Sequence, residues 1–123
     1  MRYPIRQEVW FVDLGIAPKP RPCVVISTAI GDIDRAVLTV VPHTTTIRGT
    51  EYEAQVNTFF LKPGAFDGQG IQTVPVTRAM RLLGVLKDDQ MQPVERVVCK
   101  WLALPCTKRT SPPPPPKHAR CCA

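Results

Sequence analysis

Arg21-Pro22-Cys23-Val24-Val25-Ile26-Ser27 is the stretch that decides the fold, together with Val40-Val41-Pro42-His43-Thr44-Thr45-Thr46 further along the chain. Each contains a short continuous apolar run between polar residues, a pattern consistent with a buried strand. The first run opens at an arginine, and the second ends in a cluster of threonine hydroxyls. We therefore expect a guanidinium and hydroxyl donors at the same rim of a small barrel, where they would suit a phosphate.

Other short runs of β-branched and aromatic residues indicate further strands. Turn signals rich in Gly and Pro separate these runs. The Phe-Phe-Leu run at 59–61 is expected to join the core, and a turn at 67–70 precedes an apolar run at 71–76. Strands are expected at 8–14, 21–27, 36–42, 51–57 and within 80–86.

Residues 88–103 give the one clear helical pattern. Apolar side chains recur there at spacings of three and four residues, at Met91, Val94, Val98, Trp101 and Leu102. Two aspartates precede this stripe, where the positive end of a helix dipole favours them. The stripe is expected to dock on the sheet.

Several short strands, Gly/Pro turns and one C-terminal helix indicate a mainly β fold, a small and strongly bent antiparallel barrel with a helix packed on it. The chain has 123 residues and is 44% apolar, which is enough for one core. We expect the barrel domain to span 1–104. Residues 105–123, with Pro112 to Pro116 in a row, are expected to form a disordered basic tail.

The formal net charge of +6 is unevenly distributed. Residues 1–104 hold 12 Lys/Arg against 10 Asp/Glu, so four basic residues of the tail supply most of the excess. Overall charge is therefore a weak argument for nucleic-acid binding. Such binding would depend on local placement, as with Lys19, Arg21 and Arg48 beside the two strand ends.

The five cysteines include no CxxC pair, so neither a metal site nor a cofactor is expected. Cys23 and Cys99 are interpreted as small core residues with free thiols, which fits a reducing cytoplasm. The sequence has no apolar stretch of transmembrane length and no secretory signal pattern. We therefore expect a cytoplasmic protein that does not associate with a membrane.

With strands and helix assigned, the chain resembles the MazF/PemK family of toxin endoribonucleases, the mRNA interferases. The resemblance covers roughly residues 6–104. Its two most specific pieces are Arg-Pro-x-Val-Val-Ile-Ser and Val-Pro-x-Thr-Thr, in this order and spacing. The residues that carry it lie in Val9–Leu14, Lys19–Ser27, Val40–Thr45 and Gly84–Leu104.

The resemblance implies an SH3-like barrel, a homodimer, and metal-independent cleavage of single-stranded RNA at short sequences. It also implies inhibition by a small cognate antitoxin protein. The family's catalytic arginine falls on Arg21 and its catalytic threonine on Thr44. The chain departs from the family in its short, Pro-rich connection before Arg21, where many members carry a longer loop with glycines and an acid.

The chemistry of these residue types agrees with that assignment. Arg21 can offer two parallel N–H donors to a phosphate, and Thr44 a short hydroxyl that orients the phosphate or the 2′-OH. His43 is either a participant at the site or a core histidine. The second interpretation follows from strand alternation, which points His43 opposite to Thr44. Lys19, His43, Thr45 and Arg48 are candidate RNA contacts, although Lys19 and Arg48 could equally be solvated loop charges.

Two other functions remain open on the sequence alone, because one barrel can host several activities. The first is a non-catalytic toxin similar to CcdB, which poisons DNA gyrase. The second is a degenerate barrel that serves as a binding module, with the proline tail as a docking ligand. Arg21 and Thr44 in one chain favour the ribonuclease, since a protein-binding toxin has no need of them.

Overall fold

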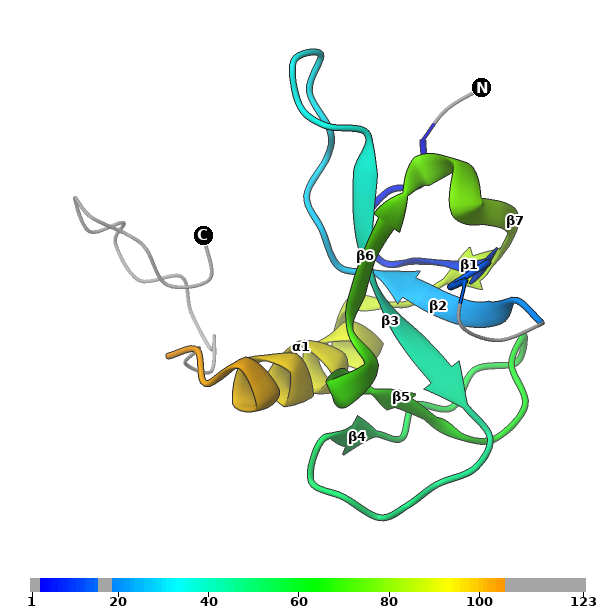
Figure 1. The fold of residues 1–123 in the computed structure, drawn as a ribbon. Coiled ribbons are helices and arrows are strands. Elements are labelled where there is room, and N and C mark those ends of the chain that lie inside the picture. The colour runs from blue at the N-terminus through cyan, green and yellow to red at the C-terminus, as the bar shows by residue number, and fades with distance from the viewer. Residues whose placement is uncertain (1–2, 16–18, 106–123) are drawn as a thin grey trace.

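Seven strands and one long helix follow one another in the computed structural model, which describes residues 3–15 and 19–105 (Figure 1). Two short 3-10 turns, η1 and η2, flank β6. The elements are β1 (Glu8–Val12), β2 (Arg21–Val25), β3 (Val37–Thr44), β4 (Glu53–Ala54), β5 (Ala65–Asp67), η1 (Gly68–Gly70), β6 (Gln72–Pro75), η2 (Val76–Arg78), β7 (Ala79–Val85) and α1 (Asp88–Leu102).

The strands form one antiparallel sheet in the order β4-β5-β3-β2-β1-β7, and β6 also pairs with β3. The long strand β3 is the centre of this arrangement. Its first half pairs with β6 and its last two residues, His43 and Thr44, pair with β5 (Figure 1). The mainly β class with a C-terminal helix is confirmed. Within the described residues β4 and β7 do not pair, so the sheet is bent but open rather than a closed barrel.

Side-chain alternation along β2 and β3 divides the interior into two apolar clusters. Val24 and Val41 face the cluster that also contains Phe66 and the buried face of α1. Their neighbours Val25 and Val40 face the second cluster, on the other side of the sheet. Since both faces of these central strands are covered, their sequences read as continuous apolar runs.

Helix α1 packs its Met91, Val94 and Val98 stripe against the sheet, as predicted. The stripe does not continue to the end of the helix, because Trp101 and Leu102 are exposed. Trp101 instead makes an edge-to-face contact with Tyr52, with ring centroids 5.3 Å apart. The last turn therefore extends past the sheet.

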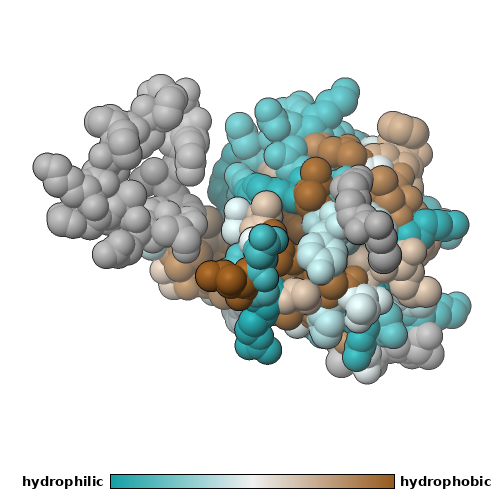
Figure 2. Space-filling view, turned by 90° about the horizontal axis from the view of Figure 1, so that it is seen from above, coloured by the Kyte–Doolittle hydropathy of each residue, from teal (hydrophilic) through white to brown (hydrophobic). Residues whose placement is uncertain are grey.

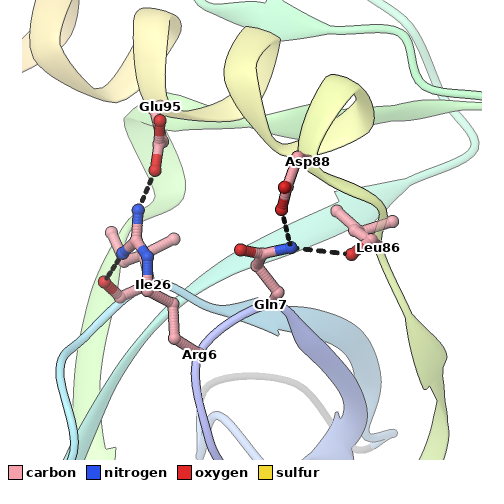
Figure 3. A network of polar contacts seen from close by, with 6 residues as sticks. All are labelled: Arg6, Gln7, Ile26, Leu86, Asp88 and Glu95. Carbon is pink, nitrogen blue, oxygen red and sulfur yellow. Dashed lines mark hydrogen bonds and ion pairs between the residues drawn. The ribbon is translucent and has the colours of Figure 1, made fainter. Parts of the chain in front are cut away.

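A polar network fastens the N-terminal segment to the helix (Figure 3). Arg6 donates to the carbonyl oxygen of Ile26 and forms an ion pair with Glu95. Gln7 donates through Nε2 to the carbonyl oxygen of Leu86 at 2.8 Å and to Asp88 Oδ1 at 3.2 Å. The start of α1 is thus tied to the residues that precede β1.

Three further expectations about local structure were also wrong. Phe59 is 100% exposed, because it sits in a turn and its neighbour Phe60 takes the place against the core. The expected strand at 51–57 shrinks to Glu53–Ala54. Cys99 is half-buried and disulfide-bonded rather than a free thiol, whereas Cys23 is buried and free.

Other apolar side chains also reach the surface. Figure 2, which views the molecule from above, shows apolar residues between hydrophilic ones on that face. The outermost strand β7 contributes Met80, Leu82 and Val85, all exposed. No helix among the described residues is long and apolar enough to cross a membrane. The predicted tail lies outside the described residues, apart from Pro105.

Candidate functional site

An open cleft of about 640 Å³ lies where β2 begins and β3 ends. Of the six residues predicted for the site, five line this cleft: Arg21, His43, Thr44, Thr45 and Arg48. Lys19 is exposed on the chain leading into β2 and is not among the lining residues. The remaining wall comes from Leu14, Pro42, Thr46, Glu53, Asp67, Gly70 and Gln72.

The register of β2 and β3 brings the two predicted catalytic residues to the same place. Cys23 lies opposite Pro42, and the antiparallel pairing runs regularly through Val24 and Val25. The pairing between β2 and β3 ends at Cys23 and Pro42, and Arg21 and Thr44 lie two positions further along the two strands. Because side chains alternate along a strand, Arg21 shares the face of Cys23, and Thr44 shares the face of Pro42. Both side chains therefore project to the same side, into the cleft.

Arg21 is exposed at the first position of β2, opposite Val12 on β1. Among the residues that the structure describes, no carboxylate forms an ion pair with it. Its guanidinium donors are therefore available to an anionic ligand.

Thr44 ends β3 and begins the loop that follows. Its Oγ1 accepts a hydrogen bond from the Thr46 amide at 3.1 Å and can donate to the Thr46 carbonyl oxygen at 3.3 Å. This turn around a threonine side chain holds Oγ1 in place. The hydroxyl keeps a free acceptor lone pair, and rotation of its O–H bond lets it donate to a ligand instead.

His43 borders the cleft but its ring is directed into the core. The residue is only 4% exposed, and the ring meets Phe66 edge-on at 5.0 Å between centroids. Nε2 has no hydrogen-bond partner among the described atoms. Burial lowers the pKa of His43, which favours the neutral ring. This placement fits the reading of His43 as a core histidine behind Thr44.

The loop from Thr45 to Thr50 is held by a carboxylate that the sequence did not single out. Glu53, at the start of β4, accepts hydrogen bonds from the Arg48 amide at 3.1 and 3.2 Å and from the Gly49 amide at 2.8 Å. These donations, that of Arg48 first, lower the pKa of Glu53. Gly49 has a φ of 82°, a left-handed conformation that glycine adopts without strain.

Two further polar residues of the cleft were also missed. Asp67 Oδ1 accepts from the Gln69 amide at 3.0 Å and caps η1. Gln72 donates through Nε2 to the Leu14 carbonyl oxygen at 3.0 Å, which ties β6 to the end of the β1 segment. The sequence marked Asp67 as a turn residue. Only its pairing with Glu53 across β4 and β5 shows that both carboxylates line one cleft.

No metal centre is evident in the described part of the chain. Residues 3–15 and 19–105 contain no group of three or more His, Cys, Asp or Glu side chains that could hold a metal ion. The chemistry available in the cleft is that of a guanidinium, hydroxyls, amides and two hydrogen-bonded carboxylates. Such a set can bind a phosphodiester and stabilise charge that develops on it.

Solved structures with the same fold include endoribonucleases and MazF proteins. An endoribonuclease from Mycobacterial species is 21% identical, with a TM-score of 0.73 and coverage of 87% of this chain and 98% of that one. An endoribonuclease from Mycobacterial species in complex with its cognate antitoxin is 22% identical, with a TM-score of 0.72 and coverage of 85% and 99%. MazF from Deinococcus radiodurans is 14% identical, with a TM-score of 0.73 and coverage of 85% and 100%.

Comparison with curated proteins finds no relative of significant sequence similarity. At the family level the match is extensive. Residues 5–102 match the family described as the PemK-like, MazF-like toxin of type II toxin-antitoxin system, and these residues contain every strand, the cleft and α1. The chain therefore belongs to the family of PemK-like, MazF-like toxins of type II toxin-antitoxin systems.

Proposed function

We propose that this protein is a sequence-specific, metal-independent endoribonuclease that cleaves single-stranded RNA, in particular mRNA, by attack of the ribose 2′-OH. The observation that carries the proposal is the location of Arg21 and Thr44 on facing strand ends of one cleft. Family membership supports the proposal independently. Because mRNA is the substrate, we place the activity in the cytoplasm.

The proposed reaction is an internal transesterification. The 2′-OH releases its proton to solvent as its oxygen bonds to phosphorus, and the P–O5′ bond breaks as the 5′ oxygen takes up a proton from solvent, so the number of protons is unchanged. The products are a 2′,3′-cyclic phosphate and a 5′-hydroxyl, so no water is consumed in this step. Arg21 donates two N–H bonds to the phosphoryl oxygens, and such donors are typically worth about 10²–10³ in rate. Thr44 orients the phosphate or the 2′-OH through Oγ1.

We assign three other predicted site residues to RNA binding. Arg48 and Thr45, on the loop after β3, contact the RNA backbone, and Lys19 adds charge near the start of β2. His43 forms the wall behind Thr44 rather than taking a proton from the substrate, since its ring is buried against Phe66. In this assignment the RNA lies across the ends of β2 and β3.

Two protein partners complete the proposal. A small cognate antitoxin binds and inhibits the toxin; an endoribonuclease of the same fold from Mycobacterial species has been solved in complex with its cognate antitoxin. We further propose a homodimer. The exposed apolar side chains Met80, Leu82 and Val85 on the edge strand β7 support a protein contact, since edge strands with apolar surface readily pair with another chain.

Incubation of the purified protein with a long single-stranded RNA in excess EDTA tests this function. We expect discrete fragments ending in 2′,3′-cyclic phosphate, and at least a hundredfold slower cleavage by Arg21→Ala and Thr44→Ala, of the order expected for removal of a transition-state donor. Arg96→Ala is the matched control, because Arg96 is exposed on α1 and does not line the cleft. Intact RNA with a folded wild-type protein would contradict the catalytic proposal and favour a gyrase-poisoning toxin or a binding module.

A further inference from the structure

We propose that Glu53 is a positioning residue that holds the loop 45–50 in the shape in which it binds RNA. The inference rests on the proposed function, since it concerns how Arg48 and Thr45 meet the RNA. Glu53 would not touch the reacting phosphate. It would act through the backbone of the loop.

The hydrogen-bond geometry is the first argument. The Glu53 carboxylate accepts the Arg48 amide with both oxygens, at 3.1 and 3.2 Å, and the Gly49 amide with Oε1 at 2.8 Å. Successive backbone N–H groups that converge on one anion form a concave nest. The carboxylate thus fixes the backbone direction at Arg48 and with it the origin of the arginine side chain.

The loop has few other anchors. Every residue from Thr45 to Thr50 is exposed, including Ile47, so no apolar side chain is buried to hold the segment. Apart from the Glu53 bonds, the described hydrogen bonds of this segment are those between Thr44 and Thr46 at its start and from the Tyr52 amide to Thr50 at its end. The order of the middle of the loop therefore depends on Glu53.

Glu53 itself has more structural contacts than the loop that it holds. Glu53 pairs with Asp67 across β4 and β5, and its neighbour Ala54 is buried in the core cluster beneath α1. Hydrogen bonding to the Arg48 amide above all, and to the Gly49 and Thr50 amides, lowers the pKa of Glu53, which favours the charged form that accepts these bonds. A strand-mounted anion thus holds a loop that would otherwise need to be ordered by the RNA.

The predicted consequence is a separation between binding and turnover. A loop freed from Glu53 must be ordered when RNA binds, and that entropy reduces affinity. Arg21 is held by its pairing with Val12 on β1 and Thr44 by its pairing with Ala65 on β5, so the chemical step is unaffected. Glu53 substitution should therefore raise KM and leave kcat nearly unchanged.

The experiment measures kcat and KM for cleavage of a short single-stranded RNA by wild type, Glu53→Ala and Glu53→Gln. We expect KM to rise about tenfold for Glu53→Ala, with kcat within about twofold, because hydrogen bonds to a charged acceptor are among the stronger ones. Glu53→Gln keeps one acceptor oxygen and should show an intermediate KM. Glu51→Gln is the matched control, since this exposed carboxylate is two residues away, faces Lys100 at 3.7 Å and does not line the cleft.

Hydrogen exchange at the Arg48 and Gly49 amides gives a readout that does not depend on RNA. Both amides should be protected in wild type and in Glu51→Gln, and should exchange faster in Glu53→Ala. If the wild-type protein cleaves no RNA, the proposed function is overturned. The exchange experiment would still test whether Glu53 orders the loop, and equal exchange in wild type and Glu53→Ala would overturn that role. An unchanged KM in Glu53→Ala, alongside an active wild type, would overturn the role of Glu53. Tighter RNA binding by that variant would also overturn it, because the carboxylate would then be a competitor of the phosphate for the same amides.

Discussion

Gly64 lies directly against the backbone of Thr44, so closely that a Cβ at position 64 would be 2.1 Å from the Thr44 carbonyl oxygen. The same Cβ would also be 2.8 Å from His43 Cε1. Thr44 also pairs with Ala65, the next residue and the first of strand β5, so the residue proposed as catalytic is positioned by contacts with Gly64 and Ala65. The position of the Thr44 hydroxyl therefore depends on Gly64, which has no side chain that could take part in the reaction.

The first prediction concerns this contact. Gly64→Ala should push the end of β3 away from β5, because the methyl group meets backbone rather than a flexible side chain. We expect a loss of about 1–3 kcal/mol in the free energy of unfolding, as for other overpacked sites. Cleavage should fall further than stability alone explains, since Thr44 moves with the strand. Chemical denaturation and RNA cleavage assays on the same variant measure both effects.

Gly31→Ala provides the control for that prediction. At Gly31 the added methyl would meet only the Asp34 carboxylate, at 3.1 Å, which belongs to an exposed side chain rather than to backbone and accepts a hydrogen bond from the Gly31 amide. We expect near wild-type stability and cleavage from this variant. If Gly64→Ala and Gly31→Ala had equal effects on stability and cleavage, the close contact between Gly64 and Thr44 would not be what positions Thr44.

The second prediction separates the charge of Arg21 from its geometry. Arg21→Lys keeps the positive charge but loses the planar fork that makes two parallel hydrogen bonds to a phosphate. We expect kcat to fall about tenfold or more, approaching the loss for Arg21→Ala, since removal of a transition-state donor costs about 10²–10³. Full activity of the lysine variant would mean that Arg21 acts only as a point charge.

Stability should not change in the same variant. Arg21 is exposed, and no carboxylate among the described residues pairs with it. Surface substitutions of this kind usually alter the free energy of unfolding by less than about 0.5 kcal/mol. Thermal unfolding of Arg21→Lys and wild type should therefore coincide, which makes any lost activity a catalytic effect.

The third prediction is a pH dependence of stability from His43. Burial lowers its pKa in the folded protein below that of the unfolded chain, so the unfolded state binds the proton first as the pH falls. The stability contribution of the neutral ring is complete above about pH 6.5, the ordinary range of histidine, and declines as the pH drops below it. Denaturation midpoints measured between neutral and mildly acid pH should show this decline.

His43→Leu should flatten that pH profile without a large loss of stability at neutral pH. The leucine fits an apolar site beside Phe66, and the replaced Nε2 has no described hydrogen-bond partner to lose. The variant should still cleave RNA, because the ring is directed into the core. A loss of cleavage with an intact fold would instead assign His43 to the reaction.

The fourth prediction contrasts two adjacent phenylalanines. Phe60 packs against the core cluster and covers Gly84, where a Cβ would be 2.6 Å from its ring. Phe59 is fully exposed. Phe60→Ala should lower the free energy of unfolding by about 2 kcal/mol or more, as for other partly buried aromatic truncations. Phe59→Ala should leave it unchanged within about 0.5 kcal/mol. Urea titrations of both variants measure the difference.

Local sequence was enough to predict much of this fold. The continuous apolar runs of β2 and β3 and the spaced apolar stripe of α1 are properties of neighbouring residues, and the structure contains all three elements. Arg21 and the threonine cluster could be singled out for the same reason, since each stands where an apolar run meets polar residues, and the family resemblance then selected Thr44 within that cluster. The strand β5 has only three residues, too few to produce a recognisable pattern.

Tertiary structure alone decided the composition of the cleft. Glu53 and Asp67 are separated along the chain, and only the pairing of β4 with β5 sets them opposite each other. The exposure of Phe59 and Trp101 was likewise decided by which side of a turn or helix end the sheet could cover. Sequence periodicity reports what a residue shares with its neighbours along one element. The site depends on contacts between elements, and those exist only after the chain has folded.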